Sequence, residues 1–202
     1  MNAGVLVARG ELLWFLHADS GITAEAVSEM EEFMRDPATA GGCFTLKIVP
    51  RRWIYRLRDA IGNRCVDRFG IALGDRGLFC RRIAFESAGR YSSARLFEDA
   101  DLYRSLRRVG VTRRLRTAIS TSSRRYETQG PIRTCLFYGL VMLLYWAGLN
   151  RRALERVVFF FFSRTRPGKM EASRQAFHTD DVLQILERPS SPLKSNLQKI
   201  HP

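Results

Sequence analysis

The sequence predicts an α/β fold, because short apolar runs typical of strands alternate with segments of helical period along most of the 202 residues. The strand, helix, strand succession is clearest over residues 11–16, 23–35 and 41–49. The first run, ELLWFL, ends abruptly in His17-Ala18-Asp19-Ser20, as expected of a buried strand that carries polar residues at its carboxyl end. With 46% apolar residues, the chain has enough material for the core of one domain without disulfide help.

The helix expected over residues 23–35 has Thr23 as a candidate cap and is ended by Asp36-Pro37. Its apolar residues recur at the helical period: Val27, Met30, Phe33 and Met34. Residues 41–49 alternate between apolar and other side chains and predict the next strand, and residues 53–66 predict a helix.

Further elements follow in the same alternation. Residues 74–80, GDRGLFC, set a polar pair between glycines before a brief apolar run, and residues 81–88 predict a helix. A second helix is expected over 97–109, opened by acids and closed by arginines as the helix dipole prefers. Residues 111–119 predict a strand. The expected organisation is an α/β domain over 1–130, apolar helices over 131–164 and a loose tail over 165–202.

The apolar stretch from Leu136 to Leu149 contains no charge, but it is shorter than the roughly 20 residues of a membrane-spanning helix. Together with the run at 157–162, it leaves two interpretations open. The helices lie on a membrane surface, with Tyr145 and Trp146 at the headgroups, or they pack on the core.

The formal net charge of +13 favours partners that carry phosphate: nucleotides, nucleic acid or anionic lipid. Recognised nucleic-acid motifs are absent, so no nucleic-acid partner is expected. The four cysteines show no Cys-x-x-Cys spacing, and a reducing compartment is the default. The first ten residues lack the pattern of a secretion signal. We therefore expect a cytoplasmic protein, with peripheral attachment to the inner face of the cell membrane left open.

Acidic residues mark two places where chemistry is expected. Asp19 directly follows a strand, where a carboxylate can bind Mg²⁺ or Mn²⁺ that grips a diphosphate. His17 is a second ligand or a structural histidine. Glu98, Asp99 and Asp101 open a helix, either as ordinary caps or with Asp99 as a general base.

Two arginine-bearing segments are candidates for ligand binding. Asp75 and Arg76 stand between Gly74 and Gly77, and glycines let a backbone approach a ligand closely; the alternative is an ordinary turn. The pair Arg124-Arg125 could stabilise the charge on a departing diphosphate, and the alternative is that both are solvated.

The order of four segments resembles the bacterial family 2 glycosyltransferases, in particular the group called transferase 2, associated with radical-SAM and selenium-related domains. These segments are MNAGVLVARGELLWFLHADS, GDRGLF, FEDADLYRSLRR and TSSRRYETQG. The resemblance covers most of residues 1 to 160. It implies a GT-A fold, meaning a Rossmann-like α/β nucleotide-binding sheet, followed here by C-terminal apolar helices. It also implies metal-assisted, inverting transfer from a nucleotide-diphospho-sugar donor to an acceptor hydroxyl that the sequence does not identify.

The resemblance also assigns roles to residues. HAD matches the metal-binding Asp-x-Asp motif, with His17 where the first Asp usually stands and Asp19 as the ligand. FED makes Asp99 the base and Glu98 the residue that orients it or the acceptor. Gly74, Asp75 and Arg76 then face the acceptor and sugar, Arg124 and Arg125 contact the diphosphate, and Asn2 and Gly4 lie at the donor site.

Family members begin with a strand and an acidic loop that hold the base and ribose, and this chain starts after that point. The resemblance therefore implies an N-terminal truncation, with a start codon upstream or a degenerate copy. The alternatives to an active transferase are an inactive truncated remnant and a non-catalytic basic module that binds membrane or nucleic acid.

Overall fold

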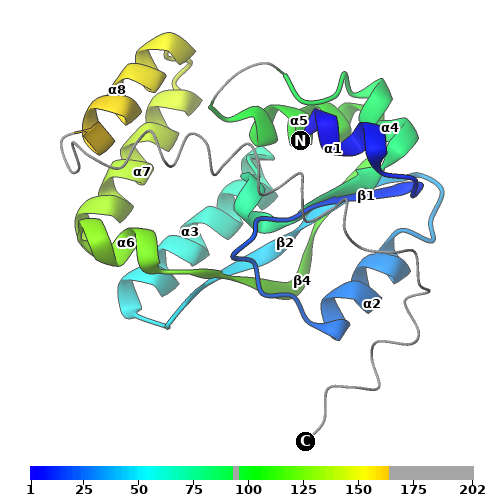
Figure 1. The fold of residues 1–202 in the computed structure, drawn as a ribbon, viewed down its shortest axis with the longest axis horizontal. Coiled ribbons are helices and arrows are strands. Elements are labelled where there is room, and N and C mark those ends of the chain that lie inside the picture. Colours follow the sequence, from blue (N-terminus) through cyan, green and yellow to red (C-terminus); the bar gives the residue numbers. More distant parts are fainter. Residues whose placement is uncertain (93–95, 164–202) are drawn as a thin grey trace, which may run out of the picture. The chain divides into compact units, whose positions relative to one another are not determined.

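The computed structural model describes residues 1–92 and 96–163, so the tail expected over 165–202 lies outside the described residues. Four strands form one sheet with helices on both faces (Figure 1). The strands are β1 (Leu12–Phe15), β2 (Thr39–Val49), β3 (Leu78–Arg81) and β4 (Val111–Ser122). The helices are α1 (Asn2–Val7), α2 (Ala24–Phe33), α3 (Trp53–Phe69), α4 (Arg82–Ser87), α5 (Glu98–Val109), α6 (Arg124–Gln129), α7 (Pro131–Trp146) and α8 (Arg151–Ser163), with a short 3₁₀ turn, η1 (Gly74–Arg76).

The sheet is mixed, with the strand order β1-β3-β2-β4. β2 and β4 are parallel, paired from Thr39 with Val111 to Val49 with Ser122, and β3 is antiparallel to both of its neighbours. β1, β2 and β4 therefore run in one direction and end at the same edge of the sheet. The α/β class predicted from the sequence is confirmed.

The predicted helices form where capping and termination favour them. At the start of α2, the Thr23 hydroxyl accepts a hydrogen bond from the Ala26 amide at 3.2 Å, as expected for an N-cap. α3 ends at Gly70, whose φ of 64° suits a residue without a Cβ. α5 has acids in its first turn and Arg107 and Arg108 in its last.

Two apolar layers hold the sheet between helices. On one face, α2 packs through Ala26 and Met30 on a cluster that includes Phe44 and Phe79. On the other face, helices α3, α4 and α5 pack on the alternate strand residues: Leu13, Phe15, Cys43, Leu78 and Cys80. Alternate side chains of each strand point to opposite faces, so both faces of the sheet are buried.

The two C-terminal helices pack on this domain through one face each. Phe137 and Val141 of α7 and Leu154 of α8 are buried in a cluster with Phe97 and Ala100. The inner faces of α7 and α8 therefore pack on the core, which is one of the two interpretations that the sequence left open. Among the described residues, no helix is long and apolar enough to cross a membrane.

Candidate functional site

The carboxyl edge of the sheet gathers most of the predicted polar residues. After β1, the chain runs across the end of the sheet to β4, the outer strand on the far side of the strand order. There Gly21 exchanges hydrogen bonds of 2.8 and 3.0 Å with Ser120 of β4 (Figure 1). η1 lies at the same edge, because only Gly77 separates it from Leu78, which pairs with Phe15 at the end of β1. Residues 17–20, η1 and the end of β4 thus share one edge, the edge at which open α/β sheets bind their ligands.

Asp99 is an acidic residue of this group whose pKa is raised. It lies in the first turn of α5, against the backbone of η1, where a Cβ added to Gly74 would stand 2.6 Å from its Oδ2. Burial and then the negative charge of Glu98 raise the pKa of Asp99 to about 6, although contacts with Tyr91, His17 and the Gly74 backbone partly oppose this. A carboxyl group with this pKa is an effective general base near neutral pH.

Tyr91 is a neighbour of Asp99 that sequence reasoning missed, since no motif marks it. Its hydroxyl is buried and has no hydrogen-bond partner of good geometry among the described residues. Burial and then the charge of Asp99 raise the pKa of Tyr91. The Asn2 amide holds the Tyr91 backbone, donating to its carbonyl at 2.9 Å and accepting from its N–H at 3.1 Å. Asn2 therefore positions Tyr91 beside Asp99.

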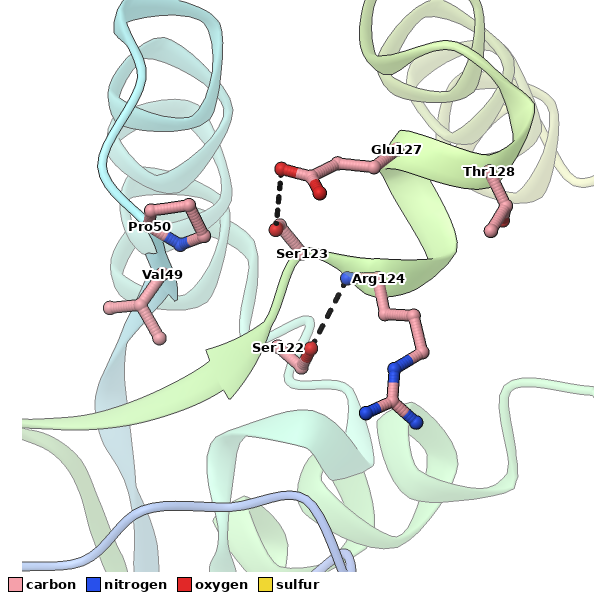
Figure 2. Close-up of a pocket in the computed structure, with 7 residues that line it drawn as sticks. All are labelled: Val49, Pro50, Ser122, Ser123, Arg124, Glu127 and Thr128. Carbon is pink, nitrogen blue, oxygen red and sulfur yellow. Dashed lines mark hydrogen bonds between the residues drawn. The ribbon is translucent and has the colours of Figure 1, made fainter.

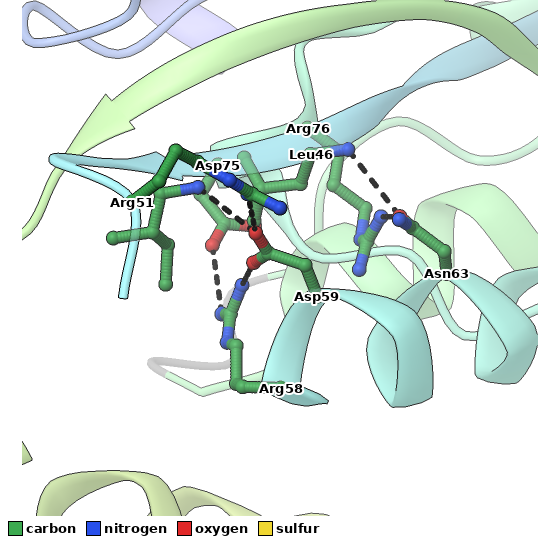
Figure 3. Close-up of polar contacts among 8 residues, drawn as sticks. Leu46, Arg51, Arg58, Asp59, Asn63, Asp75 and Arg76 are labelled. Atoms are coloured by element: carbon green, nitrogen blue, oxygen red, sulfur yellow. Dashed lines mark hydrogen bonds and ion pairs between the residues drawn. The ribbon is translucent and has the colours of Figure 1, made fainter. Parts of the chain in front are cut away.

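Asp75 is held by an arginine-rich network that joins η1 to α3 (Figure 3). Arg58 Nη2 lies 3.2 Å from Asp75 Oδ2, and Arg58 also pairs with Asp59, which binds Arg51 at 2.7 Å. Burial would raise the pKa of Asp75, but the charges of Arg58 and Arg76 outweigh it and lower that pKa. Asp75 is thus a fixed carboxylate, and its buried Oδ1 finds no hydrogen-bond partner in the described part of the chain.

Arg76 turns toward α3, away from solvent. It is 3% exposed, and its Nη1 donates to Asn63 Oδ1 at 2.5 Å (Figure 3). Gly62 provides the space, because a Cβ there would stand 2.7 Å from the Arg76 guanidinium. The predicted binding residue Arg76 therefore holds η1 on α3. Sequence reasoning missed Asn63, the partner of Arg76, and Asp59, the partner of Arg51 and Arg58, although their four-residue spacing places both on one face of α3.

At the other end of the edge, Asp19 is exposed next to β4, and the Thr121 hydroxyl donates to its Oδ2 at 3.4 Å. A hollow of about 460 Å³ opens between the ends of β2 and β4 (Figure 2). It is lined by Val49, Pro50, Ser122, Ser123, Arg124, Glu127 and Thr128. Arg124 exposes its side chain there, whereas the Arg125 side chain lies outside the described residues. Asp75 and Asp99 do not line this hollow.

Two other predicted residues lie apart from the hollow. His17 interacts electrostatically with both Asp75 and Asp99, so it belongs with the acidic pair at the α5 end of the edge. Gly4 lies inside α1, where its carbonyl accepts a hydrogen bond from Ala8 N at 3.0 Å. The edge therefore divides into an acidic end at Asp99 and a hollow at Arg124, with residues 17–20 passing between them.

A metal ion at Asp19 would have one protein carboxylate. Within residues 1–92 and 96–163, no group of three or more His, Cys, Asp or Glu side chains could hold an ion. Mg²⁺ is often bound by one or two carboxylates together with substrate phosphates and water. An ion at the exposed Asp19 would have to be of this shared kind, with its other ligands supplied from outside the chain.

The structure defines the class of this protein as a mixed α/β domain with an acidic and arginine-bearing edge. No family model, no curated protein and no solved structure matches the chain. The family resemblance remains a prediction that rests on the four ordered segments.

Proposed function

We propose that this chain is a GT-A glycosyltransferase that moves a sugar from a nucleotide-diphospho-sugar to an acceptor hydroxyl and inverts the anomeric carbon. The observation that carries the proposal is the placement of Asp99, a partly buried carboxyl with a pKa of about 6, beside η1 at the carboxyl edge of the sheet. Asp19 and the hollow at Arg124 lie at the same edge. In the proposal, this hollow binds the diphosphate of the donor.

In the proposed reaction, the acceptor oxygen attacks the anomeric carbon from the face opposite the diphosphate. The bond from that carbon to the diphosphate oxygen breaks, the nucleotide diphosphate leaves with the electron pair, and Asp99 takes the acceptor proton. Burial and then the charge of Glu98 keep the pKa of Asp99 high. The ionised Asp75, whose Oδ1 has no described hydrogen-bond partner, would accept a hydrogen bond from a sugar or acceptor hydroxyl.

In the proposed reaction, cationic groups at the hollow stabilise the negative charge of the leaving diphosphate. Arg124 is the described side chain suited to a phosphate oxygen, and Arg125 follows it in the sequence. Asp19 is the residue that would hold Mg²⁺ or Mn²⁺. Such an ion would neutralise part of the diphosphate charge. Peripheral attachment to the inner face of the cell membrane is also part of the proposal, supported by the exposed apolar residues of α7 and α8.

The test is a donor screen with the purified chain in the presence of Mn²⁺, in which released nucleotide diphosphate is measured for a panel of nucleotide-sugars. We expect slow hydrolysis of at least one donor and metal-dependent binding of its nucleotide diphosphate, weakened in Asp19→Ala and Arg124→Ala. Glu31→Gln, an exposed residue of α2, is the control. A folded chain that neither turns over nor binds any donor contradicts the proposal, and nucleotide binding without turnover favours the inactive remnant.

A further inference from the structure

A row of exposed apolar side chains runs along α7, on the side opposite its packing contacts. Ile132, Leu136, Leu140 and Leu143 are each at least half exposed, and Leu136 is 69% exposed. Spacings of four, four and three residues place them on one helix face. Since α7 already meets the domain through its opposite face, core packing does not account for this row.

A second row lies on α3, which contacts α7. Trp53, Leu57 and Ile61 recur every four residues, all are at least half exposed, and Trp53 is 69% exposed. Ile54 on α3 and Cys135 on α7 pack in one cluster, so the two helices that carry the rows lie in contact. We call the two rows together the apolar outer face, and in Figure 1 the helices that carry it lie far from α4.

Exposed cations accompany this face. The exposed arginines described on α3, α7 and the adjacent α8 are Arg56, Arg64, Arg68, Arg133, Arg152 and Arg156. The acids of these helices are fewer. Asp59 is buried and paired, Asp67 pairs with Arg114, Glu155 is partly buried, and α7 has no acid. The apolar outer face is therefore set in a positive field.

We propose that the apolar outer face docks on an anionic lipid bilayer, with α3 and α7 lying in the plane of its surface. Exposed leucines with a flanking tryptophan and arginines are the combination that an anionic interface attracts, through burial of apolar area and attraction to lipid phosphates. At 1.5 Å per residue, the 16 residues of α7 extend about 24 Å, too short to cross the core of a bilayer. A second copy of this chain is a poorer occupant, because two such faces would bring like charges together.

This docking deepens the peripheral attachment that forms part of the proposed function, but it does not depend on glycosyl transfer. The test is co-sedimentation of the full chain with vesicles of phosphatidylcholine alone or mixed with phosphatidylglycerol. We expect binding to the mixed vesicles only, weakened by salt. Leu136→Glu should lower the affinity about tenfold or more, because it places a charge where a leucine would enter the interface. Trp53→Ala should lower it in the same direction.

Ile83→Glu is the matched control, since Ile83 is 74% exposed on α4, away from the proposed face. It should bind like the wild type. Circular dichroism of Leu136→Glu should match the wild type, because the leucine side chain is largely exposed. Absence of binding to the mixed vesicles, equal binding to both vesicle types, or equal losses in Leu136→Glu and Ile83→Glu overturn the proposal. A lipid-free dimer that Leu136→Glu dissociates also overturns it, in favour of a second copy.

Discussion

Replacing Asp99 by Asn should stabilise the fold at pH 7 while removing the proposed base. The folded pKa of about 6 lies above the ordinary value of 3.8, so the folded state holds the proton more tightly than the unfolded state. Below about pH 4 both states are protonated and the group has no effect. As pH rises from 4 through 6, the free energy of unfolding falls by up to about 3 kcal/mol, at roughly 1.4 kcal/mol for each pH unit between the two values.

Urea denaturation at pH 4.5 and pH 7.5 measures this effect. Relative to wild type, Asp99→Asn should gain up to about 3 kcal/mol at the higher pH and much less at the lower one. Glu31→Gln, which removes an exposed carboxyl from α2, should follow the wild-type pH dependence. If Asp99→Asn shows the same pH dependence as the wild type, Asp99 does not carry the raised pKa, and the case for it as a base near neutral pH fails.

Two further substitutions test the packing around the site. Gly74→Ala should displace the Asp99 carboxylate, since the new Cβ would stand 2.6 Å from Oδ2. We expect donor turnover to fall at least tenfold and the free energy of unfolding to fall by about 1–3 kcal/mol. In the control Gly139→Ala, the added methyl meets no atom within 4 Å, and equal losses in both variants would refute the contact. Arg58→Met should cost about 3 kcal/mol in urea denaturation by leaving Asp75 without its partner; a loss no larger than that of the exposed Arg56→Met would refute the role of Arg58.

Much of the secondary structure was predictable because its signals are local. The Thr23 cap and apolar spacing predicted α2, and the acids and arginines of residues 97–109 predicted α5, each within two or three residues of the observed bounds. The antiparallel direction of β3 was not predicted, because pairing between distant segments leaves no local pattern. The segment of α1 carried no assignment, since six residues are too few to show a helical period.

The candidate site was predictable in its residue types but only partly in its geometry. The sequence singled out His17, Asp75 and Asp99 separately, at a strand end, between two glycines and at a helix start, and the structure brings the three together. Sequence reasoning assigned Arg76 to a ligand, whereas its side chain lies buried on Asn63. Tyr91 and Arg58 were missed because both reach the site from elements without a motif, through contacts that only the folded chain creates.

The measurement that tests the central claim most directly is the pH dependence of donor turnover by the wild type and Asp99→Asn, with nucleotide diphosphate release as the readout. The wild-type rate should rise with pH through about 6, as the Asp99 carboxyl loses its proton. Asp99→Asn should lose about 100-fold or more of that rate at pH 7.5, the usual contribution of a general base. A variant that retains the wild-type rate and pH profile would contradict the assignment of Asp99 as the base and, with it, the proposed mechanism.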